Sequence, residues 1–348
     1  MSDKQVQKSG DDSVNIQVKS VNVQKGLTYL DVKEIALDVF KNNFEHLSVV
    51  AADTAKKRAE EITGNFLHEL EKRNREALNQ AQDPDFQYSL FTVQKEYAKS
   101  GDKDLGDLLV DILVERTKVE QRGLLQIVLN ESLAVAPKLT NSQLCALSII
   151  FSIKYTRDLR MNSLDMIVHY LSQRLSPFAI DLPKSQASYQ HLEFAGCGSI
   201  SIGSSNINKI FKIRYPGVFT KGFSKEQFDN KIAQISGSEK LLIPCLRDNS
   251  LFQFNASDFE TLKNKTKEEG NSETEYAKIE AFWKKYLISD EELKKELIKK
   301  DVNMAIIYDV WENTPMKNMT LTSVGIAIAH AYTRSKTGNT SDLSVWIN

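Results

Sequence analysis

The chain has 348 residues, of which 41% are hydrophobic, so it is long enough to form two or three domains with substantial cores. Its 45 Lys and Arg residues balance 46 Asp and Glu residues, and the formal charge of -1 argues against a general polyanion-binding surface. Three cysteines, Cys145, Cys197 and Cys245, form no CxxC pair, which argues against a disulfide framework or a cysteine-rich zinc site and fits a reducing cytoplasm.

The first element in chain order is a doubled phrase, because residues 13–26 read SVNIQVKSVNVQKG, two near-copies of one heptad. Apolar and polar residues alternate within each copy, and this period predicts short β-strands. A seven-residue repeat cannot keep equivalent side chains on one face of a straight strand, so we expect a corner near Ser20. A pair of short strands leaves unpaired backbone N–H and C=O groups along both edges, and these groups need further strands as hydrogen-bond partners. We therefore expect residues 1–30 to form an oligomerisation segment that joins copies of this chain.

A long helical stretch follows from Asp31, where apolar residues recur at helical spacing among many charged residues. With one break at most, near Ser48 or Gly64, residues 31–82 would form a helical arm of about 75 Å. Its apolar stripe is too narrow for a buried core helix, so the arm needs partner helices from this chain or another. The residues that we expect at the contact between copies, on the β segment and the arm together, are Val14, Asn15, Ile16, Gln17, Val21, Asn22, Val23, Gln24, Ile35, Val39, Phe40 and Phe44.

The next block, residues 83–175, has the pattern of a helical bundle with short connections. Asp102 and Asp104 are placed to cap one of its helices. The stretch LCALSIIFSI is apolar nearly all round and predicts a central core helix. The helices predicted in this block span residues 86–99, 105–119, 122–135, 142–154 and 163–175.

The amino-acid composition changes at Pro177. Residues 176–255 hold most of the remaining Gly and Pro, as expected for a mixed α/β region. Short strands are predicted there at residues 199–202, 210–214, 241–244 and 251–254.

Helical patterns return in a C-terminal helical domain, residues 256–348, with predicted helices over 256–267, 273–287, 290–300 and 321–335. The chain ends in DLSVWIN, and we expect Trp346 to be buried because a solvated tail rarely carries such residues. The predicted fold class is therefore mainly α, with a short N-terminal β segment, a small mixed α/β region, a long helical arm and a helical bundle.

The segment GCGSISIG resembles a phosphate-binding loop, but Gly203 is followed by two serines and no lysine, and no helix is expected to open there. A glycine-rich turn that leads into a short strand is the favoured interpretation. Cys197 as a nucleophile would need a base, and His191 is the one local candidate. The five histidines form no HExxH or HxH pattern, so we expect no metal, no other cofactor and no catalytic residues.

Nucleic acid is disfavoured as a partner. In KKRAEEITGNFLHELEKRNR the basic residues alternate with glutamates, a pattern more typical of i,i+4 pairing than of a track for phosphates. The longest apolar runs are too short to span a bilayer, and the start of the chain has no apolar h-region, so we expect a cytoplasmic protein without a membrane span.

Several segments resemble known proteins. GDDSVNIQV, GLTYLDVKEIALDVFKNNFEHLS and AKKRAEEI resemble an N-terminal module of assorted bacterial proteins, often ones from phage-defence-like loci. DKDLGDLLVDILVER, LTNSQLCALSIIF, YQHLEFAGCGSISIG, RYPGVFTKGF, LTSVGIAIAHAY and DLSVWIN resemble one uncharacterised bacterial family that is known only by locus tags. The middle helices are more loosely similar to abortive-infection alpha-type proteins. The resemblance implies a bacterial cytoplasmic protein with a role in antiviral defence, and it implies no reaction.

Two functions from different classes remain. The favoured one is a non-catalytic, self-assembling interaction protein, a sensor or effector component whose N-terminal segment and arm build a homo-oligomer. Its further partner would be a phage or host protein. The alternative is an effector enzyme or nucleic-acid-binding protein with its site in residues 176–255.

Overall fold

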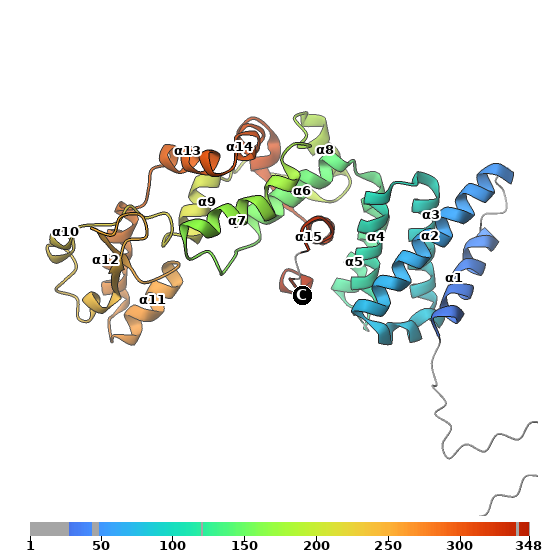
Figure 1. Ribbon diagram of the computed structural model, residues 1–348, viewed down its shortest axis with the longest axis horizontal. Helices are drawn as coiled ribbons and strands as arrows, with labels where there is room; N and C mark the ends of the chain where they lie inside the picture. The colour runs from blue at the N-terminus through green and yellow to red at the C-terminus, as the bar shows by residue number, and fades with distance from the viewer. Residues whose placement is uncertain (1–27, 44–48, 120, 339–340, 348) are drawn as a thin grey trace, which may run out of the picture.

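The first part of the described chain is a bundle of helices (Figure 1). The structure is a computed structural model that describes residues 28–43, 49–119, 121–338 and 341–347. Asp102, rather than Asp104, caps the fourth α-helix by accepting a hydrogen bond from Leu105 N. The bundle consists of α1 (Tyr29–Asn43), α2 (Val49–Arg73), the 3-10 helix η1 (Arg75–Gln82), α3 (Pro84–Ser100), α4 (Lys103–Arg116) and α5 (Leu124–Val135).

The long helical arm predicted over residues 31–82 is wrong in its shape. α1 and α2 pack against each other and against α3, so the two helices lie side by side rather than end to end (Figure 1). Residues 44–48 lie outside the described part. α2 continues through Gly64 without a break. The narrow apolar stripe finds its partner helices in this chain, where Phe66 and Leu70 of α2 are fully buried.

A second group of helices forms the middle of the molecule and receives the C-terminal helix. α6 is buried along most of its length, as predicted for a central core helix, and Thr140 and Gln143 start it with a capping box. α15 packs on α6 and also on α4 and α5, so it joins the middle of the molecule to the bundle (Figure 1). The group consists of η2 (Ala136–Lys138), α6 (Asn141–Lys154), α7 (Leu164–Arg174), η3 (Ser176–Phe178), α8 (Gln186–Phe194), α9 (Ile207–Arg214), α13 (Asp290–Lys300), α14 (Asn303–Asn313), η5 (Pro315–Asn318), α15 (Ser323–Thr337) and η6 (Leu343–Val345).

Two small antiparallel sheets complete the fold. β1 (Gly198–Ile200) pairs with β4 (Met319–Leu321), with Gly198 opposite Leu321, and β2 (Leu242–Pro244) pairs with β3 (Phe252–Phe254). The strands predicted near β1, β2 and β3 are confirmed, whereas β4 was not predicted. The strand predicted at 210–214 is wrong because this segment belongs to α9, which Asn206 caps and which buries Ile207 and Phe211 on one face.

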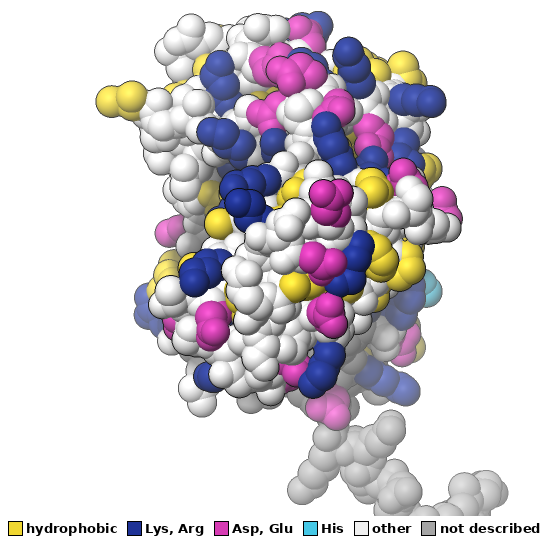
Figure 2. All heavy atoms as spheres, turned by 90° about the vertical axis from the view of Figure 1, so that its left-hand side faces the viewer, with side chains coloured by type: hydrophobic (Ala, Val, Ile, Leu, Met, Phe, Trp, Pro, Cys, Tyr) yellow, Lys and Arg dark blue, Asp and Glu magenta, His cyan; other side chains and the backbone are white. Residues whose placement is uncertain are grey.

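The predicted mixed region, residues 176–255, is divided: its first helices belong to the middle group, and its later part forms, with α11 and α12, the end of the molecule opposite the bundle (Figure 1). There η4 (Ser238–Leu241), α10 (Lys225–Asp229), α11 (Phe259–Glu268) and α12 (Glu273–Lys285) accompany β2 and β3. Their core is aromatic and includes Phe223, Phe254 and Trp283. Figure 2 shows this end, on which Lys and Arg side chains are interspersed with Asp and Glu. Neither the basic nor the acidic side chains form a continuous patch on the face that Figure 2 shows.

The tail after α15 returns to the middle of the molecule. Trp346 is half-buried rather than buried, and its Nε1 donates a hydrogen bond to Tyr155 O at 2.9 Å. Its ring lies edge-on to Phe151 at 5.0 Å between centroids. Leu343 and Ile347 on either side are buried, so this tail is part of the core.

The start of α15 requires a glycine. A Cβ added at Gly325 would lie 1.8 Å from the carbonyl oxygen of Cys197, just before β1. No real side chain tolerates that distance, so α15 reaches its place beside β1 and α6 because position 325 has none.

We expect Gly325→Ala to lower the free energy of unfolding by about 3 kcal/mol or more, because backbone must move to admit the methyl group. The matched control is Gly64→Ala in the middle of α2, where a Cβ meets nothing within 4 Å. That change should stabilise the protein by about 0.5–1 kcal/mol. Urea unfolding followed by circular dichroism measures both variants. Equal unfolding midpoints for the two would contradict the close approach of α15.

Candidate functional site

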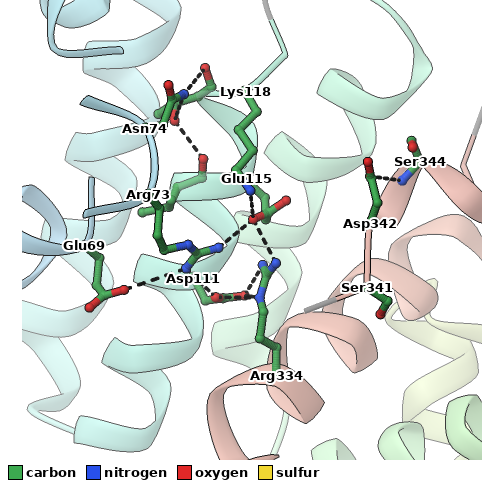
Figure 3. A network of polar contacts seen from close by, with 12 residues as sticks. Glu69, Arg73, Asn74, Asp111, Glu115, Lys118, Arg334, Ser341, Asp342 and Ser344 are labelled. Atoms are coloured by element: carbon green, nitrogen blue, oxygen red, sulfur yellow. Dashed lines mark hydrogen bonds and ion pairs between the residues drawn. The ribbon is translucent and has the colours of Figure 1, made fainter. Parts of the chain in front are cut away.

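A partly buried network of ion pairs lies where α2, α4 and α15 meet (Figure 3). Asp111 and Glu115, one turn apart on α4, face two guanidinium groups. Arg73, the last residue of α2, places Nη1 at 2.8 Å from Asp111 Oδ1 and Nη2 at 2.5 Å from Glu115 Oε1. Arg334 of α15 places Nη2 at 2.6 Å from Asp111 Oδ2 and Nη1 at 2.8 Å from Glu115 Oε1. The two carboxylates therefore connect the end of α2 to α15, although these two helices are far apart in the sequence.

The network is ionised because its charges compensate one another. Burial opposes ionisation of Glu115, but Arg334, Lys118 and Arg73 hold the pKa of this carboxyl below its ordinary value. Burial likewise opposes the charge of Arg73, yet Asp111 and Glu115 raise the pKa of its guanidinium. Loss of Arg73 or Arg334 would leave the buried carboxylates of Asp111 and Glu115 with only one compensating guanidinium group, which is costly.

A hollow lies elsewhere on the bundle. We call it the η1–α5 cleft; it is an open cleft of about 1020 Å³ between η1, the start of α3, the end of α4 and α5. Its lining is mostly polar or charged: Glu76, Asn79, Gln80, Asp83, Asp85, Arg116, Arg122, Gln126, Asn130 and Glu131, with Val119 and Ile127 as the apolar members.

Asp85 organises one wall of this cleft. Its carboxylate pairs with the guanidinium of Arg116 and accepts hydrogen bonds from Asn130 Nδ2 at 3.2 Å and Gln126 Nε2 at 3.4 Å. Burial would raise the pKa of the Asp85 carboxyl, but Arg116 and Asn130 hold it below its ordinary value. Arg116 itself is only 3% exposed. The wall is therefore a preformed, ionised surface that can recognise polar groups by charge and hydrogen bonding.

The residues predicted at the contact between copies are only partly described. Those between positions 14 and 24, and Phe44, lie outside the described residues. Ile35 and Val39 are half-buried on α1, beside a small hollow against α3. Phe40 is 3% exposed and packs with alanines of α2 and α3 in its own chain. Its predicted role in contact with another copy is corrected, because this chain already covers the ring.

Cys197 has the surroundings of a structural thiol. It is fully buried, and burial raises the pKa of the thiol to about 12. Its predicted base, His191, instead places Nδ1 at 2.9 Å from Gln143 Nε2. The thiol is therefore protonated at neutral pH, and no arrangement of the described residues around it resembles a nucleophile and its base.

The segment after Cys197 leads into β1, as predicted, and then into α9, which was not predicted. Residues Gly203 to Ser205 are fixed against η5 and α14, because Asn318 Nδ2 donates to Gly203 O and Trp311 Nε1 donates to Ser205 O. Within the part of the chain that the structure describes, no group of three His, Cys, Asp or Glu side chains is placed to hold a metal ion. Among the same residues no helix has the length and apolar character to cross a membrane.

Sequence reasoning missed both polar sites of the bundle. A signal for the ion network was present, because Asp111 and Glu115 interrupt the apolar run LLVDILVER at positions that a core helix would bury. Their cationic partners could not be identified from the sequence, because Arg73 and Arg334 lie 38 and 223 positions away from Asp111. The η1–α5 cleft had no comparable signal, because its lining residues are ordinary surface residue types.

Comparison with known proteins assigns the chain to a family. A family model described only by a locus-tag label ending in "-like" matches residues 26–347, and the chain belongs to this uncharacterised family. No curated protein and no solved structure matches the chain.

The ion network predicts a large effect of one substitution. We expect Arg334→Met to lower the free energy of unfolding by about 3–5 kcal/mol. The carboxylates of Asp111 and Glu115 stay buried in this variant but lose one of the two guanidinium groups that neutralise them. The matched control is Lys336→Met on the same helix, whose exposed ion pair with Asp104 should contribute less than about 1 kcal/mol. Urea unfolding at neutral pH measures both. A loss below about 1 kcal/mol for Arg334→Met would show that the network does not stabilise the fold.

Proposed function

We propose that this protein is a non-catalytic, self-assembling interaction protein whose copies are joined through the N-terminal residues 13–25. Its biological setting in this proposal is the bacterial cytoplasm, in antiviral defence, with a phage or host protein as the further partner. The setting rests on the resemblance of the segments around GDDSVNIQV and AKKRAEEI to a module of phage-defence-associated proteins.

The observation that carries the proposal is the character of the η1–α5 cleft. One wall is formed by the ion pair of Asp85 with Arg116 and by amide side chains that donate hydrogen bonds to Asp85. Such a surface suits recognition of another chain, where complementary charge sets specificity. A reaction site usually holds a group whose pKa is shifted toward neutrality for proton transfer, and Asp85 is shifted away from it.

The alternative function, an effector with its site in residues 176–255, has weaker support. The thiol of Cys197 is buried with a raised pKa, and the segment Gly203 to Ser205 is held by hydrogen bonds to the protein itself. We therefore keep assembly as the proposed function.

Assembly through the doubled phrase predicts a change of mass in solution. The double variant Ile16→Asp, Val23→Asp places charges at two positions that alternate with polar residues, and we expect it to convert the assembly to smaller species. The control is the double variant Lys4→Asp, Lys8→Asp in the polar leader, which should assemble as the unmodified chain does. Light scattering coupled to gel filtration measures the masses. The proposal fails if the unmodified chain has the mass of one chain, 39.4 kDa, or if Ile16→Asp, Val23→Asp keeps the native mass.

A further inference from the structure

The first described helix, α1, lies beside one wall of the η1–α5 cleft. The described chain begins at Thr28, directly before α1, and α1 packs against η1, which forms one wall of the cleft. In the sequence, residues 13–25, which join copies in the proposed function, end three positions before Thr28.

Cleft and phrase have opposite charge. Four carboxylates line the cleft, Glu76, Asp83, Asp85 and Glu131, against the guanidinium groups of Arg116 and Arg122. Arg116 is buried in its pair with Asp85, so the exposed carboxylates of Glu76 and Glu131 dominate the rim. The doubled phrase carries Lys19 and Lys25 and no acidic residue. Attraction between the two is therefore favourable, and salt would weaken it.

The remaining chemistry also fits an extended segment. Asn79, Gln126 and Asn130 offer amide donors and acceptors in the cleft, which suit a peptide backbone and the Asn and Gln side chains of the phrase. Ile127, which lines the cleft and is 41% exposed, offers an apolar contact for the alternating Val and Ile side chains. At about 3.3 Å per residue, residues 13–25 would span about 43 Å when extended.

We propose that the η1–α5 cleft of one copy receives residues 13–25 of a second copy. This inference rests on the proposed function and names the acceptor surface for the assembly. Each chain then has one donor segment and one acceptor cleft, so the contact is heterologous and a ring closes when the last donor meets the first acceptor. Direct pairing of the phrases with one another, strand on strand, is the competing arrangement.

Complementation between two defective full-length chains separates these arrangements. The donor-defective chain carries Ile16→Asp and Val23→Asp, and the acceptor-defective chain carries Glu76→Lys and Glu131→Lys. Both glutamates are exposed, so their replacement should leave the fold intact, which circular dichroism checks. The control chain carries Glu268→Lys and Glu291→Lys, the same change of charge at exposed positions of α11 and α13.

Each defective chain alone should have the mass of one chain, 39.4 kDa, whereas the control should assemble as the unmodified protein does. An equimolar mixture of the two defective chains should give a species of twice that mass, because one intact donor and one intact cleft remain. If the mixture stays at the mass of one chain, the intact phrase does not bind the intact cleft and the inference is wrong. If the acceptor-defective chain assembles normally while the donor-defective chain does not, assembly stands and the cleft is not the acceptor.

A charge exchange gives an independent test within one chain. Lys19→Glu with Lys25→Glu should abolish assembly, and combining these changes with Glu76→Lys and Glu131→Lys should restore the native mass. Failure of the combined chain to assemble, with its fold intact, would show that these charges do not face one another and would overturn the inference.

Discussion

The fold depends on two carboxylates buried on one helix. Asp111 and Glu115 lie in the apolar run of α4, where ionised groups are costly unless they are paired and hydrogen-bonded. Arg73 from the end of α2 and Arg334 from α15 supply the compensation, and both reach the same two side chains. Because these cations come from opposite parts of the sequence, the requirement to neutralise α4 ties the beginning of the chain to its end.

This constraint explains why α15 occupies the middle of the molecule. The helix contacts α6 through an apolar face and the bundle through Arg334, and Gly325 lets its first turn approach the backbone at Cys197. The bundle that carries the η1–α5 cleft is thereby fixed to the helices that follow it. A partner that binds in the cleft would therefore contact a bundle that packing and ion pairs hold against α15.

The sequence was sufficient where one local signal dominated. The all-apolar pattern of α6 and the cap at Asp102 identified a core helix and a helix start correctly.

Prediction failed where the outcome depended on partners that are distant in the sequence. A stripe on α1 and α2 shows that a partner helix is needed but does not say which chain supplies it, and the partner proved to be α3. In α9, Ile207 and Phe211 fit helical spacing, but β-branched residues in a short segment also favour a strand, and the cap at Asn206 decided the outcome. The candidate cleft could not be predicted because it exists only once η1, α4 and α5 are packed.

Hydrogen exchange of the intact protein tests the central claim that α15 and the bundle form one cooperative unit. If the ion network and the packing around Arg334 join them, the slowest amides of α4, α6 and α15 should exchange through a single opening with one free energy and one urea dependence. Arg334→Met should then lower the protection of α4 and α15 together. Exchange of the α15 amides through an opening of their own, at lower free energy than those of α4, would contradict the account.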